Sequence, residues 1–342
     1  MRHNFLFRSL LFLLATSLLL ASCSEDKREI PDVSLIQADL KVKRLDLEME
    51  AFESKQDVVE FLNKYPKFSE TYLDRRQYPH DSILVNQLYE FATYEFNDTL
   101  FMDTKRVFGD FSDVESEFEK AFQFVKYYYP NEKLPELYTV LTGFANFKFG
   151  KDISLNEEMI VLSLEYFAGK TATYRPPADQ VPDYILNRYD KTYLVSMIMS
   201  FYSGKFNQSE FVDKTLLADM IYFGKMHYFT KQIMPNTADS LIIGYSGQEM
   251  ANVDFNQKNI YGHFVEKNLF FEKSERIKNK YVGERPKTTE IADECPPRIG
   301  RWLGWEIVKS YMEENQDVTL QQLMANKNAQ EIFQQSKYKP RK

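Results

Sequence analysis

The spacing of apolar and polar residues predicts several helices in the first third of the chain. Apolar side chains that return every three or four residues form one stripe of a helix, and three stretches have this spacing. Residues 40–46 instead alternate between apolar and polar, which is typical of a short strand. The predicted helices cover residues 46–62, 82–96 and 113–129, and a proline follows the first and the last of them.

Two apolar runs rich in β-branched and aromatic residues follow, at residues 137–146 and 159–167. Turn-forming residues at 150–152 separate the two runs, and an Ala-Gly pair at 168–169 closes the second. We therefore expect the runs to be neighbouring strands of a small sheet in a mostly helical fold.

The second half of the chain predicts four more helices. Residues 190–202 are apolar nearly all round, and a helix without a polar face is normally buried in the centre of a domain. The other stretches are 216–234, which Pro235 ends, a more polar one at 248–271, and a last one that begins near Ile299. Because no repeat and no Gly/Ser linker divides the pattern, it indicates one α+β domain over residues 39–342.

The N-terminus has the pattern of a secretory signal peptide. Arg2 and Arg8 precede an apolar run over residues 10–20, which is too short to cross a membrane as a helix. The Leu-Ala-Ser-Cys sequence at 20–23 resembles the bacterial lipobox, in which the cysteine is acylated and becomes the first mature residue. We expect residues 1–22 to be removed, Cys23 to carry a diacylglycerol and acyl anchor, and residues 23–38 to form a tether.

The composition excludes a disordered chain and argues against nucleic acid as a partner. Of the 342 residues, 44% are hydrophobic and 27% are charged, without a low-complexity tract. The net charge is −7, and it becomes −9 when Arg2 and Arg8 are lost with the signal peptide. Lys and Arg form no run before residues 337–342, although phosphate binding would need one. We expect membrane contact only through the lipid.

Cys295 is the one thiol left in the mature chain if Cys23 is acylated. It then has no partner for an intrachain disulfide. Cys295 is either buried and inert, which the sequence favours, or a reactive or intermolecular site.

Known catalytic motifs are missing from the sequence. There is no HExxH, GxSxG, P-loop or GxGxxG. His227 and His263 are weak candidates for metal ligands, and Asp219 or Glu249 could supply a third, but metal ligands are usually more closely spaced. The alternative is that His227 packs against apolar neighbours on its helix. The sequence thus predicts a protein that is not an enzyme and that holds no metal and no cofactor besides the lipid.

The segment at residues 295–312 is the most distinctive part of the sequence. Gly300 and Gly304 are four residues apart on one helical face, which would let a second helix approach closely. The segment is either a tightly packed core helix or a partner-binding helix, because Trp and Arg are frequent interface anchors. The residues that would form such a partner or groove surface are Arg298, Arg301, Trp302 and Trp305. The two arginines could instead join Glu306 in an ion network at the helix end.

Several sequence features together carry a family resemblance. They are Cys23, Val42-Lys43-Arg44-Leu45-Asp46, Ile243-Gly244-Tyr245-Ser246, the pattern Pro297-Arg298-x-Gly300-x-Trp302-x-Gly304-Trp305-x-Ile307-Val308-x-x-Tyr311-Met312, and the ending Ser336-Lys337-Tyr338-Lys339-Pro340. The chain resembles the gliding-motility lipoprotein family GldB of Bacteroidetes over nearly all of its mature length. The resemblance implies an envelope lipoprotein, in the outer membrane, that gliding and the type IX secretion apparatus require. It implies partners among the gliding and secretion proteins and no known catalytic reaction.

The order of elements is also similar, more distantly, to zincin-type metallopeptidase-like lipoproteins. In those proteins a buried helix carries HExxH, a later helix carries a glutamate ligand in a Glu-Gly-x-x-x-Tyr context, and a closing helix with two glycines packs behind the site. Here residues 194–200 of the buried helix include no His or Glu, and Phe223 stands where the glutamate would. Because zinc needs three side-chain donors to activate water, the resemblance implies a degenerate, pseudo-metallopeptidase scaffold. Its former cleft would survive as a binding groove.

Two other hypotheses stay open at the level of the sequence. One is a residual metal-dependent peptidase or hydrolase that uses His227 and His263. The other is a surface lipoprotein that binds peptide or glycan, for which an aromatic fraction of 15% is weak support. Three Asp-Ser/Thr-apolar triplets also resemble the O-glycosylation sequence of exported Bacteroidetes proteins, and their acceptors are Ser82, Thr99 and Ser240.

Overall fold

The computed structural model describes residues 29–144, 151–177 and 181–340. Val33–Lys342 forms one compact unit, and Met1–Asp32 is a separate unit of which only residues 29–32 are described. The predicted signal peptide and Cys23 therefore lie outside the described residues. In the part that is described, no helix has both the length and the apolar composition that crossing a membrane would require.

A four-stranded sheet lies within the Val33–Lys342 unit, in the order β1-β2-β4-β3. The neighbours β1, β2 and β4 are parallel, and β3 pairs with β4 in the antiparallel direction at the edge. The prediction that the two apolar runs form neighbouring strands is confirmed, as is the short strand predicted near residue 42. The strands are β1 (Val42–Arg44), β2 (Glu136–Val140), β3 (Ile153–Leu155) and β4 (Met159–Ser163).

The first third of the chain is helical, as predicted, but the helix expected over residues 46–62 is wrong as one element. The chain leaves the helix at Ala51 and restarts it at Ser54, whose hydroxyl accepts from the Asp57 N–H while the Asp57 carboxylate accepts from the Ser54 N–H. This reciprocal cap satisfies backbone donors at a new helix start. The helices are α2 (Leu45–Glu50), α3 (Lys55–Lys64), α4 (Pro66–Thr71), α5 (Asp81–Ala92), α6 (Asn97–Phe108) and α7 (Ser112–Tyr128), with the 3-10 helices η2 (Arg75–Gln77) and η3 (Leu164–Phe167).

The helices predicted over 190–202 and 216–234 are confirmed, and the one predicted over 248–271 is wrong as a single helix. It breaks at Asn256 and again at Asn268, which has a left-handed backbone with φ of 53°. The helices are α8 (Asp183–Leu186), α9 (Lys191–Tyr202), α10 (Leu216–Ile233), α11 (Asp239–Ile243), α12 (Gly247–Phe255), α13 (Gln257–Glu266), α14 (Glu275–Val282), α15 (Ile299–Glu314), α16 (Leu320–Ala325) and α17 (Ala329–Ser336), with the 3-10 helices η4 (Ser203–Lys205) and η5 (Leu269–Phe271). The predicted α+β fold, mostly helical with a small sheet, is confirmed at this level.

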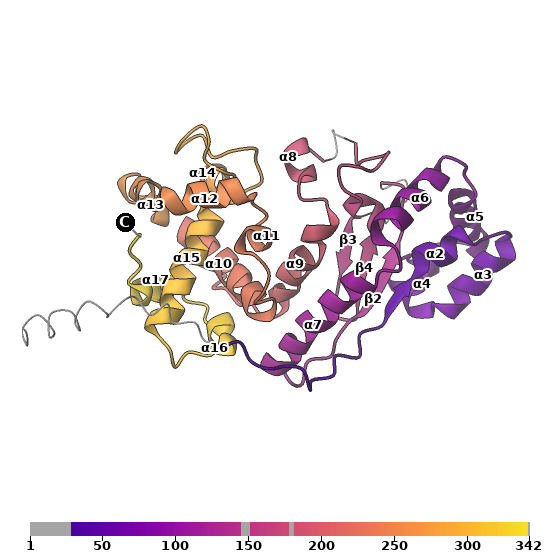
Figure 1. Ribbon diagram of the computed structural model, residues 1–342, viewed down its shortest axis with the longest axis horizontal. Coiled ribbons are helices and arrows are strands. Elements are labelled where there is room, and N and C mark those ends of the chain that lie inside the picture. The colour runs from indigo at the N-terminus through magenta and orange to yellow at the C-terminus, as the bar shows by residue number, and fades with distance from the viewer. Residues whose placement is uncertain (1–28, 145–150, 178–180, 341–342) are drawn as a thin grey trace, which may run out of the picture. The chain divides into compact units, whose positions relative to one another are not determined.

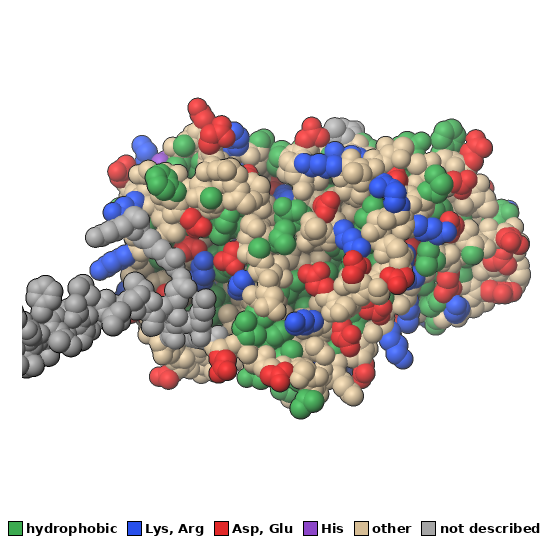
Figure 2. Space-filling view, viewed as in Figure 1, with side chains coloured by type: hydrophobic (Ala, Val, Ile, Leu, Met, Phe, Trp, Pro, Cys, Tyr) green, Lys and Arg blue, Asp and Glu red, His purple; other side chains and the backbone are tan. Residues whose placement is uncertain are grey.

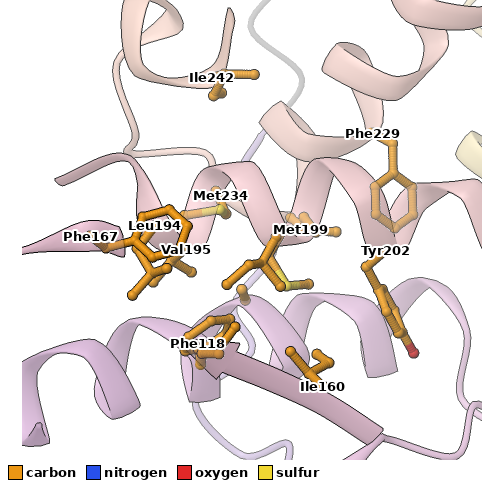
Figure 3. Close-up of a cluster of buried hydrophobic side chains, with 14 of the residues drawn as sticks. Phe118, Ile160, Phe167, Leu194, Val195, Met199, Tyr202, Phe229, Met234 and Ile242 are labelled. Carbon is orange, nitrogen blue, oxygen red and sulfur yellow. The ribbon is translucent and has the colours of Figure 1, made fainter. Parts of the chain in front are cut away.

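Helix α9 lies between the sheet and α10 (Figure 1) and is buried on nearly all sides, as its apolar sequence predicts. Figure 3 shows its side chains packed between Phe118 of α7, Ile160 of β4 and Phe229 of α10. Burying each large apolar side chain stabilises the fold by roughly 1.5–3 kcal/mol, so this cluster is a major part of the core. The α9 side chains labelled there are Leu194, Val195, Met199 and Tyr202.

Charged side chains of both signs are interspersed on the face that Figure 2 shows. Ion pairs between side chains of the surface include Arg75 with Asp81 and Arg76 with Glu70. This mixed surface agrees with the sequence analysis, which found no basic run in the body of the chain.

Candidate functional site

Helices α10 and α15 cross at two glycines. A Cβ atom on Gly304 would overlap the carbonyl group of Met220, and a Cβ atom on Gly224 would overlap the carbonyl group of Gly304. The close helix approach predicted from the glycines of α15 is therefore present at Gly304. Gly300 faces α14 instead, where an added Cβ would lie 3.0 Å from the Val282 side chain.

Two motifs of the family resemblance, residues 243–246 and the pattern that begins at Pro297, meet at the start of α15. The Tyr245 hydroxyl donates to the Pro297 carbonyl oxygen at 2.6 Å, and Arg298 Nη2 donates to the Gly244 carbonyl oxygen at 3.2 Å. Gly244 ends α11 with φ of 74°, and a Cβ there would lie 2.7 Å from Arg188 Cδ. Glycine is thus required by the backbone conformation and by the space that an arginine occupies.

Three guanidinium groups gather around one carboxylate at this place. Arg188 Nη2 lies 2.7 Å from Glu284 Oε2 and is hydrogen-bonded to it. Arg298 Nε and Arg301 Nη1 each lie 3.7 Å from a Glu284 oxygen, which is within ion-pair distance but too long for a hydrogen bond. We refer to Arg188, Glu284, Arg298 and Arg301 as the arginine cluster.

Arg301 is fixed by two further contacts. Its Nε donates to the Val282 carbonyl oxygen at 2.6 Å, and its guanidinium lies 4.0 Å from the centre of the Phe223 ring. A guanidinium over an aromatic face is attracted by the ring quadrupole and keeps its N–H edge free for other partners. Arg301 therefore links α15 to both α10 and the end of α14.

The cluster is positively charged at neutral pH. Burial alone would raise the pKa of Glu284, but Arg298, Arg188 and Arg301 lower it below its usual value, so the carboxylate is ionised. Burial and the charge of Arg298 lower the pKa of Arg301 to about 10, which still leaves it protonated at neutral pH. Burial also lowers the pKa of Arg298. Desolvation and mutual repulsion thus disfavour the positive charges that the fold brings together.

Trp302 and Trp305 are fully buried at 0% exposure. Neither ring can contact a partner in this structure, so the core-helix alternative describes the tryptophans, and the proposed partner surface does not include them. Arg298 is also buried, whereas the Arg301 side chain keeps 15% of its exposure. Of the four residues predicted for a partner surface, Arg301 alone is exposed enough for a partner to contact its side chain.

His227 lies beside Trp305, with 5.4 Å between the ring centres. Burial lowers its pKa well below the usual value, with Arg301 and Arg298 acting in the same direction, so the ring is neutral. Within the described chain, neither of its ring nitrogens has a hydrogen-bond partner. The structure thus places His227 among packed side chains, which is the alternative that the sequence analysis weighed against a metal ligand.

His263 has other neighbours. Its Nε2 lies 2.9 Å from the Tyr281 hydroxyl, and its ring packs against Phe264 and Tyr281. Asp219 binds Lys278 at 2.8 Å, and Glu249 caps α12 through Ser246. Within residues 29–144, 151–177 and 181–340, no three His, Cys, Asp or Glu side chains come together as a metal site. The donors named in the metal hypothesis therefore do not fit a zinc ion.

Cys295 is buried at the wall of a cavity of about 430 Å³ between α12, α13 and the segment before α15. Burial raises the pKa of its thiol to about 12, so it is protonated at neutral pH and weakly nucleophilic. Asparagines supply most of the polar groups of the cavity, which is lined by Asn252, Val253, Asn256, Asn259, Ile260, Ile291, Ala292, Glu294, Cys295 and Pro296.

Two arginines of the cluster, Arg298 and Arg301, could be singled out from the sequence, but Arg188 and Glu284 could not. The alternative that the two arginines join Glu306 in an ion network is wrong about the acid, because Glu306 pairs with Lys309 one turn further along the helix. Arg188 and Glu284 lie in connecting segments and are 96 residues apart in the chain. Nothing in the sequence indicated this ion pair, except that the two motifs lie next to it in the fold.

Fold and site together define a mostly helical α+β protein in which two distant sequence motifs join at an arginine cluster. The family model described as gliding motility protein GldB matches residues 26–340, and the chain belongs to this lipoprotein family. It is therefore a lipoprotein of the cell envelope related to gliding motility. The comparisons with curated proteins and with solved structures gave no match.

Proposed function

We propose that the protein supports the assembly or stability of the gliding and type IX secretion machinery through protein contacts, without catalysing a reaction. In this proposal, the lipid on Cys23 holds it to the outer membrane. Family membership supports the link to gliding. The absence of a reaction rests on the side chains of α9 and α10.

The proposal rests on the residues that occupy the positions at which a zincin-type protein would have its zinc ligands. In α9 the hydroxyl of Ser196 donates to the Leu241 carbonyl oxygen at 3.2 Å, and the neighbouring side chains are apolar and buried. In α10, Phe223 lies under the guanidinium of Arg301. A phenyl ring and a guanidinium offer no lone-pair donor to a metal ion, so these two side chains supply no metal ligand.

The packing behind this position supports a degenerate zincin-like scaffold. Gly224 follows Phe223, as the glycine follows the glutamate in the peptidase-like pattern, and it packs against Gly304 of the closing helix. The order of strands, buried helix, second helix and closing helix is also that of the pattern. We interpret the arginine cluster as the replacement for a lost metal centre, with contact in place of catalysis.

A genetic complementation experiment tests whether chemistry at the histidines is needed. A strain that lacks the gene receives either the wild-type protein or the variant His227→Phe/His263→Phe. We expect the variant to restore colony spreading and secretion, because an aromatic ring can replace the neutral His227 beside Trp305. Immunoblots of the membrane fraction control for the amount of protein.

A variant that is present in the membrane at wild-type level but restores neither phenotype would contradict the proposal. Metal analysis of protein purified without chelators is the second arm. One zinc ion per chain that is lost in the same variant would show that the histidines form a metal site after all.

A further inference from the structure

We propose that the arginine cluster is a binding site for a carboxylate group presented by a protein partner. The inference rests on the proposed function, since it names the chemistry by which a partner would be recognised. It starts from the hydrogen bonds that the cluster leaves unmade and from its unbalanced charge.

The cluster has unused hydrogen-bond donors. A guanidinium carries five N–H groups in a planar fork. Within the described chain, Arg298 donates one hydrogen bond, to Gly244, and Arg301 donates one, to Val282. The Arg298 side chain is 95% buried, yet its Nε has no hydrogen-bond partner among the described residues. A buried donor without an acceptor is unfavourable. The unused N–H groups that an oxygen ligand can reach from solvent are those of Arg301, whose side chain keeps 15% of its exposure.

The site also has one more positive charge than its carboxylates neutralise. The guanidinium groups of Arg188, Arg298 and Arg301 carry three positive charges. The carboxylates of Glu284 and Glu249, which both act on Arg298, supply two negative charges and leave one positive charge unbalanced. His227 is neutral and adds no charge. One singly charged carboxylate would therefore balance the site, whereas a phosphate dianion would exceed the balance.

The position of the site makes it reachable from solvent. The Glu284 side chain keeps 35% of its exposure, and those of Arg188 and Arg301 keep 14% and 15%. The cluster also lies at the N-terminus of α15, a helix of 16 residues, where free N–H groups and the helix dipole favour an anion. The unpaired Arg298 donor and the helix end are independent features that select for the same ligand.

Titration calorimetry on the full-length protein in non-ionic detergent tests the inference. The probes are N-acetyl-glycyl-glycine with a free carboxylate, the same peptide as its amide, acetate, and inorganic phosphate. We expect the free peptide acid to bind and the amide not to bind. Acetate should bind more weakly than the peptide acid if the source is a protein segment, and equally well if a free small acid is the true ligand.

Variants assign the binding to the cluster. Arg301→Gln should weaken the binding of the peptide acid about tenfold or more, because a charge-assisted hydrogen bond is lost. Glu284→Gln should strengthen the binding of the peptide acid, since a negative charge that repels the carboxylate is removed. Arg188→Gln serves as a second test in case Arg301→Gln fails to fold. Arg76→Gln, at an exposed ion pair away from the cluster, is the matched control and should bind as the wild type does.

Equal binding of acid and amide, an unchanged affinity in both arginine variants, or phosphate binding more tightly than the peptide acid would each overturn the inference. So would the absence of peptide binding at millimolar concentration. None of these results would touch the proposed function, which the complementation with histidine variants tests separately.

Discussion

At the scale of the single residue, Glu165 places a carboxyl group in the interior just beyond the carboxyl end of β4. Its Oε1 accepts from the Thr142 N–H at 2.7 Å and from the Thr142 hydroxyl at 2.8 Å, in the segment that follows the parallel neighbour β2. Its Oε2 is buried and has no partner within the described residues. Burial raises the pKa of Glu165 above its usual value of 4.5, against the opposing effect of Thr142.

This residue gives a prediction about pH. A carboxyl group whose pKa is raised in the folded state contributes stability below pH 4.5, and this contribution is lost as the pH rises through the folded pKa. Glu165→Gln has no such titration, so the variant should gain stability relative to the wild type between pH 4 and pH 8. Urea unfolding at a series of pH values measures the difference. A stability difference between variant and wild type that is constant with pH, or that changes in the other direction, would be inconsistent with a buried carboxyl group whose pKa is raised.

At the scale of the element, the crossing of α10 and α15 depends on the lack of side chains at two positions. Gly304→Ala should destabilise the protein by about 1–3 kcal/mol or more, because the added methyl group would overlap the Met220 carbonyl. The control is Gly262→Ala in α13, where an added Cβ meets no atom within 4 Å. That change should be stabilising by about 0.5–1 kcal/mol. Thermal unfolding of both variants checks that the two stability changes have opposite signs. Equal shifts of the melting temperature would contradict the packing argument.

How far the elements can be predicted from the sequence depends on what fixes each one. The largely apolar stretch of α9 could be predicted because burial on nearly all sides favours apolar residues. The breaks at Ser54 and Asn256 could not be predicted from periodicity, since apolar spacing continues across them and local capping interrupts the helix. The glycine of α15 predicted a close helix contact, but its partner Gly224 needed the three-dimensional structure.

The site was less predictable than the fold for a physical reason. Ion pairs between connecting segments have no periodic pattern, so nothing in the sequence joins Arg188 to Glu284. The same limit applies to the tryptophans of α15. Their residue type is common at interfaces and in cores alike, and only the observed burial separates the two cases.

At the scale of the whole molecule, the protein is an envelope lipoprotein in which two of the family motifs meet at one charged site. The anchor is predicted from residues 20–23, and the folded unit begins at Val33, so a short segment would connect the lipid to the domain. The buried tryptophans hold α15 in place, and the helix positions Arg298 and Arg301. In the proposed function, the scaffold supplies rigidity and the arginine cluster supplies the contact.

Colony spreading with a variant of the cluster is the most direct test of this account. A strain that lacks the gene is complemented with Arg301→Gln or with the control Arg76→Gln, and membrane immunoblots establish equal amounts of the two proteins. The account predicts that the control restores spreading and that Arg301→Gln does not, because the cluster then lacks a guanidinium that faces its partner. Full spreading with a folded Arg301→Gln protein at wild-type level would contradict it.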